Sequence, residues 1–93
     1  MLFRSMTTGR YGHTATLLHT GQVLVVGGYR STYLASAELY DPRTRTWTAT
    51  DSLHVARSWH VAACLSHVGV LVVGGYGVPS VGYIRSAEVW STA

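Results

Sequence analysis

The sequence predicts an all-β fold in which one antiparallel unit of four strands is written twice. The segment VLVVGGY at residues 23–29 returns unchanged at residues 70–76. Short runs rich in Val, Thr and aromatic residues, which favour strands, alternate with Gly and Pro. No stretch combines apolar residues at helical spacing with capping signals. These three observations indicate a duplicated β-sheet module without helices.

The duplication extends well beyond the apolar run. Arg10 and His13 recur 47 residues later as Arg57 and His60. The segment SAELY at residues 36–40 recurs 50 residues later as SAEVW, so the second copy has three extra residues. They fall within residues 77–82, whose Gly and Pro content predicts a loop. Insertions in repeat proteins map to loops, so the two copies align as structural repeats.

Four strands are expected in the first copy. Residues 13–19 are rich in Thr and aliphatic side chains and precede a turn at Thr20-Gly21, so they predict a strand. Residues 23–26 are continuously apolar, which is typical of a strand covered on both faces. Residues 38–41 form a third strand that stops at Pro42, because proline offers no ladder donor. Residues 44–50 alternate Thr and Trp and predict a more exposed fourth strand.

The order of these features resembles a kelch repeat of the bacterial type. It runs Arg-x-x-His, apolar strand, Gly-Gly, Ala-Glu-x-Tyr-Asp-Pro, Thr-x-Thr-Trp and then Leu53, with the period near fifty that kelch repeats have. The resemblance covers nearly the whole chain and implies four-stranded blades of a β-propeller. The residues that carry the repeat are Gly27, Gly28, Glu38, Tyr40, Trp47, Gly74, Gly75, Glu88 and Trp90.

The alignment predicts three segments: an outer-strand fragment at 1–5, blade one at 6–52, and blade two at 53–93 without its outer strand. Propellers typically need four to eight blades. We therefore expect the bare blade faces to be covered by further copies of the chain. A homotrimer with six blades is favoured over a dimer or tetramer, and residues 1–5 of one copy complete a neighbour's blade. The alternative is that the sequence is an excerpt of a longer propeller.

Two repeated features are expected to be structural. Two adjacent glycines let a neighbouring chain or ring lie close to the backbone, and Tyr29, Tyr40 or Trp47 is expected to supply that ring. His13 and His60 are expected to hydrogen-bond the repeated Glu38 and Glu88, because a buried carboxylate needs donors. An alternative is that the repeated Arg and His side chains line a central channel and bind an anion.

Composition excludes several classes of protein. The net charge is +3 and the seven arginines are dispersed, unlike a nucleic-acid-binding stripe. No apolar run approaches membrane-spanning length, and no N-terminal hydrophobic segment resembles a secretion signal, so a cytoplasmic location is expected. Cys64 is the single cysteine, so no internal disulfide is possible. The absence of Lys and Asn is typical of a GC-rich, bacterial genome.

Catalysis, metal binding and cofactors are not predicted. The five histidines lack zinc-site spacing, and no Ser lies in the strand-turn-helix setting of an acyl-transfer nucleophile. The copper-containing oxidases among kelch propellers need a Tyr-Cys cross-link, but Cys64 stands at a repeat position held by Leu17 in the first copy. The resemblance implies a non-catalytic scaffold for protein binding instead.

The alternative function is a carbohydrate-binding, lectin-like module. The binding candidates in either case are Arg10, Tyr11, His13, Arg57, Trp59 and His60, with Tyr33 and Tyr83 as further exposed aromatic residues. Aromatic packing between blades is expected for Tyr29, Tyr40, Trp47, Tyr76 and Trp90.

Overall fold

The computed structural model describes residues 9–77 and 82–91, and these residues form eleven strands and no helix. The first sheet is blade one. It contains β1 (Thr14–Leu17), β2 (Val23–Val26), β5 (Ala37–Asp41) and β6 (Thr46–Thr50), in the order β1-β2-β5-β6 with every pair antiparallel. The four strands predicted for the first copy are confirmed, with ends that differ by at most two residues.

The second sheet is blade two. It contains β7 (Val61–Leu65), β8 (Gly69–Val73) and β11 (Ala87–Ser91), in the antiparallel order β11-β8-β7. These strands match β1, β2 and β5 of blade one. The predicted outer-strand fragment at residues 1–5 lies outside the described residues, so its exchange between copies stays a prediction.

Two short hairpins were not expected from the sequence. Strands β3 (Tyr29–Arg30) and β4 (Thr32–Tyr33) form one hairpin after the first Gly-Gly pair. Strands β9 (Tyr76–Gly77) and β10 (Gly82–Tyr83) form the other after the second pair. The residues of the predicted loop that lie between β9 and β10 are outside the described part of the chain.

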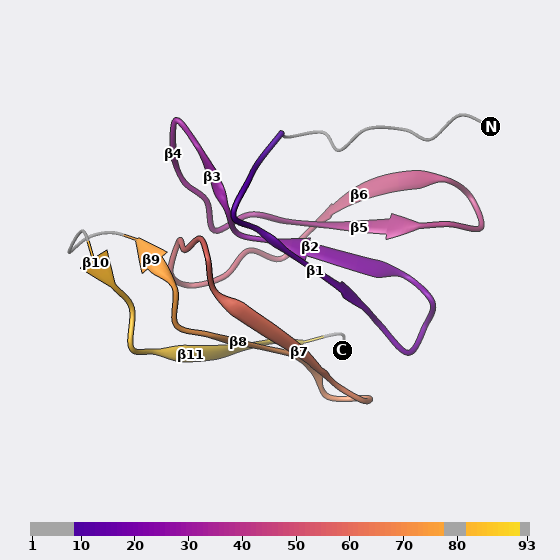
Figure 1. Ribbon diagram of the computed structural model, residues 1–93. Coiled ribbons are helices and arrows are strands. Elements are labelled where there is room, and N and C mark those ends of the chain that lie inside the picture. The colour runs from indigo at the N-terminus through magenta and orange to yellow at the C-terminus, as the bar shows by residue number, and fades with distance from the viewer. Residues whose placement is uncertain (1–8, 78–81, 92–93) are drawn as a thin grey trace.

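Figure 1 shows the two sheets beside one another, with the two hairpins at one end of the molecule and the β1–β2 and β7–β8 turns at the opposite end. Strands β1 and β7 lie next to each other, as the innermost strands of adjacent propeller blades do. Each blade therefore has one end with a β-hairpin and one end with a tight turn.

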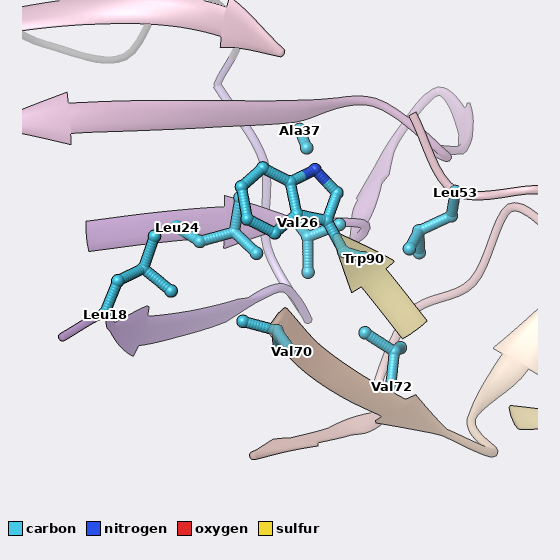
Figure 2. Packing of buried hydrophobic residues seen from close by; sticks show 8 residues of the cluster. All are labelled: Leu18, Leu24, Val26, Ala37, Leu53, Val70, Val72 and Trp90. Carbon is cyan, nitrogen blue, oxygen red and sulfur yellow. The ribbon is translucent and has the colours of Figure 1, made fainter. Parts of the chain in front are cut away.

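The hydrophobic core lies between the blades (Figure 2). Because directly paired residues share a face of a sheet, Leu24 and Val26 of β2 project from the same side as Ala37. From blade two they meet Val70, Val72 and Trp90, all of which are buried. The Trp90 indole also donates a hydrogen bond to the backbone oxygen of Asp51 at 3.1 Å. Burial of Trp90 between the blades confirms its predicted packing role.

The opposite face of blade two is apolar and exposed. The strand register places side chains of β7, β8 and β11 on this outer face, where Val61 is 67% exposed and Val89 48% exposed. Its members are Val61, Ala63, Leu65, Leu71, Val73, Ala87 and Val89. The equivalent face of blade one, which carries Leu24, Val26 and Ala37, is covered by blade two. No helix of the described residues is long and apolar enough to cross a membrane.

Candidate functional site

Each blade is held together by a buried arginine. Arg10 Nη1 donates to the backbone oxygens of Gly27 and Ser36, both at 2.9 Å, and Arg10 Nη2 donates to Glu38 Oε2 at 3.1 Å. Both side chains of this ion pair are almost fully buried. The guanidinium therefore ties the Gly-Gly turn to the start of β5.

Arg57 repeats this network in blade two. Its Nη1 donates to the backbone oxygens of Gly74 and Ser86, and its Nη2 donates to Glu88 Oε2 at 3.1 Å. Glu88 also accepts the backbone N–H groups of His54 and Val55, at 2.7 and 3.1 Å. These donors satisfy both oxygens of the Glu88 side chain. The two repeated arginines therefore serve the fold and do not offer free cations to a ligand.

The predicted histidine–glutamate bond is wrong for His60. His60 Nε2 lies 2.8 Å from Thr14 Oγ1 of blade one, and its Nδ1 has no partner in the described structure. Burial, and secondly the charge of Arg57, lower the pKa of His60 to about 4. His13 is half-buried, and burial followed by the charge of Arg10 lowers its pKa too. Arg57, and not His60, donates to Glu88, because the several N–H groups of a guanidinium can bond two carbonyls and the carboxylate at the same time.

The Gly-Gly pair of blade one receives the start of blade two. A Cβ on Gly27 would lie 2.6 Å from both Arg57 O and His60 Cε1, which is closer than real Cβ atoms approach. The N–H of Gly28 donates to Arg57 O at 2.7 Å. Close approach at the glycines is thus confirmed, but the neighbour is the Arg-x-x-His segment of the next blade. The expected ring of Tyr29, Tyr40 or Trp47 is not what lies closest.

An aromatic groove of about 400 Å³ opens where the blades meet, at the end with the β3–β4 and β9–β10 hairpins. We call it the tyrosine groove. Tyr29 forms tilted and edge contacts with Tyr11 and Tyr33, with ring centroids 5.6 and 5.0 Å apart. Both blades contribute to the lining, which consists of Tyr11, Tyr29, Tyr33, Ser58, Trp59 and Tyr76.

Trp59 has an unusual backbone conformation at this groove. Its φ is 56°, in the left-handed region, whereas the equivalent residue of blade one is Gly12 with φ 71°. A bulky residue with positive φ is uncommon, and such strain clusters at functional sites. The Trp59 indole lies close to the backbone of Gly12 and remains 69% exposed. The exposed Trp59 ring is therefore held at the groove by a backbone conformation that is unfavourable for a bulky residue.

Ser58 adds a polar group to the same groove. Its side chain is buried, yet its Oγ has no hydrogen-bond partner in the described structure. Buried hydroxyls normally have a partner, because leaving one unpaired costs about 1–3 kcal/mol. The groove thus combines aromatic rings with an unsatisfied hydroxyl.

The structure separates the predicted binding residues into two sets. Tyr11 and Trp59 lie in the groove. Arg10 and Arg57 are instead buried in ion pairs with Glu38 and Glu88, and His13 and His60 lie near these arginines. Tyr29 and Tyr76, expected to pack between blades, line the groove instead. Their signal in the sequence was the position directly after Gly-Gly, where positive φ at both glycines turns the chain out of the sheet. Tyr40 and Trp47 contact each other, with ring centroids 4.9 Å apart.

Comparison with known proteins agrees with this architecture. Residues 9–53 match the Kelch motif. The chain is 38% identical over 74 residues, or 77% of its length, to an F-box/kelch-repeat protein of Arabidopsis thaliana. It spans only 19% of the length of that plant relative, and a bacterial origin stays a prediction. The motif match in blade one, its structural copy in blade two and this relative show that the chain belongs to the kelch-repeat family.

Proposed function

We propose that this chain is a binding unit that contacts a partner protein through the tyrosine groove. Kelch repeats generally serve as non-catalytic modules for protein–protein binding. The groove carries the proposal because exposed Tyr and Trp side chains with polar tips are the residues enriched at binding hot spots. Trp59 supports it most strongly, since its strained backbone holds an exposed ring that the fold does not bury.

The occupant that fits this lining is an extended, proline-rich peptide segment. Grooves lined by aromatic rings bind the polyproline II conformation, whose shape is set before binding. The side chains of the groove carry no formal charge, so affinity comes from ring contacts. The Trp59 indole N–H and the tyrosine hydroxyls supply donors for backbone carbonyls of the peptide.

A glycan is the alternative occupant, because aromatic rings also stack on sugars. A lectin-like propeller would repeat its pocket in each blade. The two copies differ at this position, however, with Tyr11-Gly12 in one and Ser58-Trp59 in the other. The groove is therefore a single site at the junction of the blades, which favours a peptide.

Titration of the chain with proline-rich peptides, followed by isothermal titration calorimetry, tests the groove. Trp59→Gly removes the ring and places glycine where φ is positive, as in Gly12. We expect stability to stay within about 1 kcal/mol and peptide affinity to fall at least about tenfold. The matched control is Trp47→Phe, on the outer strand of blade one, which should retain binding.

Two outcomes would overturn the peptide assignment. Full affinity in Trp59→Gly would show that the groove is not the contact surface. Binding of neutral oligosaccharides at the groove, with no response to peptides, would favour the lectin function instead.

We further propose that the outer face of blade two docks a blade of a second copy. Blade two covers the equivalent face of blade one by placing Val70, Val72 and Trp90 against it. A second copy would dock its blade one on the outer face of blade two in the way that blade two docks on blade one. Such a head-to-tail contact closes into a ring when the rotations between successive copies sum to a full turn. A homotrimer would give six blades, and residues 1–5 of one copy would pair with β11 of another.

Light scattering tests this assembly. We expect a mass of roughly three times 10.1 kDa, and Val61→Glu should reduce it to one chain by placing a charge on the outer face. Thr46→Glu, on exposed β6, is the matched control and should leave the mass unchanged. A single-chain mass with cooperative unfolding for the unaltered chain would contradict self-assembly.

A further inference from the structure

Two histidines meet at the end of the molecule opposite the tyrosine groove. His19 lies in the turn between β1 and β2, and His67 lies in the turn between β7 and β8. Figure 1 shows these two turns at the same end of the molecule. His67 Nδ1 is 3.1 Å from His19 Nε2, and the ring centroids are 4.3 Å apart. They are 48 residues apart in the sequence, so the spacing of histidines along the chain could not indicate this pair.

The pair is not part of the repeat. The position equivalent to His19 in the second copy is Ser66, and the position equivalent to His67 in the first copy is Thr20. The blade architecture therefore does not require either ring, unlike His13 and His60. Both residues are exposed, so a solute reaches them without any rearrangement of the core.

The geometry points to a transition-metal site, and we propose that His19 and His67 together bind Zn²⁺ or a related imidazole-preferring ion such as Cu²⁺ or Ni²⁺. Imidazole nitrogen is a preferred ligand of these ions. Two nitrogens bound tetrahedrally at about 2.0–2.1 Å from zinc are about 3.3–3.4 Å apart. The observed separation is within a few tenths of an ångström of this value. The ion would replace the proton that the two nitrogens share.

The site is open. No group of three or more His, Cys, Asp or Glu side chains that could hold a metal occurs in the described ranges. The remaining coordination positions would hold water or a donor from another molecule, so the ion is exchangeable. Because one ligand comes from each blade, bound metal would connect blade one to blade two and favour the folded state.

Thermal unfolding with zinc chloride as the only additive tests the proposal. When free zinc is about nine times its dissociation constant, the unfolding equilibrium constant should fall about tenfold. His19→Gln and His67→Gln should each abolish this response. His54→Gln, which changes an exposed histidine elsewhere, should retain it. NMR of the imidazole signals should show zinc shifting only two of the five histidines.

Three results would overturn the site. The first is no zinc-dependent stabilisation of the unaltered chain. The second is an equal zinc response in the double variant of His19 and His67. The third is loss of the response in His54→Gln, which would indicate dispersed binding to surface histidines. Because both rings are exposed, their replacement leaves the core intact and the variants remain informative.

Discussion

The two blades share one internal design but differ in what covers them. Arg10 and Arg57 make matching bonds to a glycine carbonyl, a serine carbonyl and a glutamate. By contrast, the Cβ position of Gly27 in blade one lies against Arg57 and His60 of blade two, whereas the Cβ position of the equivalent Gly74 has only Ile84 O nearby, at 3.5 Å. The comparison separates what a blade needs for itself from what it needs in order to bind a neighbour.

The covered and open faces also differ in polarity. Thr14 on blade one contacts His60 of blade two, but the equivalent residue on the outer face is Val61. A blade that docked on this outer face would meet more apolar surface and would lack the threonine partner for its histidine. The contact inside the chain and the proposed contact between copies are therefore similar in shape and different in chemistry.

The largest expected effect comes from removing either buried arginine. Arg10→Met leaves Glu38 buried without its charged donor, and breaking a buried ion pair in this way costs about 3–5 kcal/mol. Arg57→Met should lie at the low end of that range, because the Glu88 side chain is 16% exposed whereas that of Glu38 is 3% exposed. The free energy of unfolding from urea titration measures both.

Arg43→Met provides the control for this ranking. Arg43 forms a surface ion pair with Asp41 at 3.5 Å and is 80% exposed, so its loss should cost less than about 1 kcal/mol. If Arg10→Met lowered the free energy of unfolding no more than Arg43→Met, the buried Arg10–Glu38 ion pair would not hold blade one together.

The next effect isolates the contact between blades. Gly27 and Gly74 have nearly equal φ values, 71° and 68°, so replacement by Ala strains both backbones alike. Only at Gly27 does the new Cβ collide with Arg57 O and His60. Such overpacking typically costs about 1–3 kcal/mol, so Gly27→Ala should be less stable than Gly74→Ala by that amount.

Equal losses in the two alanine variants, measured at a concentration where the chain is monomeric, would show that blade two does not rest on Gly27 in solution. The same pair also bears on assembly. If a second copy docks as blade two does, Gly74→Ala should weaken the oligomer while leaving the chain folded.

The strands and the core were predictable because their signals are local or repeated. The apolar run at residues 23–26 and its copy defined both central strands, and Pro42 marked the end of β5. The tyrosine groove was predictable only in part, since Tyr11 and Trp59 stood out while Tyr29 and Tyr76 resembled packing residues. Their exposure depends on the turns after Gly-Gly, and the pairing of His19 with His67 depends on how the blades dock. Neither is encoded in local sequence pattern.

The smallest expected effect is the pH dependence that His60 imposes. In the folded chain burial and Arg57 keep its pKa at about 4, whereas in the unfolded chain it takes up a proton near the ordinary value of about 6.5. Stability from the neutral ring is therefore complete above pH 6.5. It declines as the pH falls toward 4, because in that window the unfolded state binds the extra proton.

Urea unfolding of the unaltered chain and of His60→Gln, compared between pH 7 and pH 5, measures this contribution. As the pH falls, the unfolding equilibrium constant of the unaltered chain should rise up to about tenfold more per pH unit than that of the variant. His13→Gln should flatten the pH profile less, because His13 is only half-buried. His60 is covered by Gly27 and Thr14 of the other blade, and the described residues include no such cover for His13. An identical pH profile for His60→Gln and the unaltered chain would mean that His60 is hydrated in solution. The contact between the two blades would then admit water, contrary to the close packing of Gly27 against Arg57 and His60.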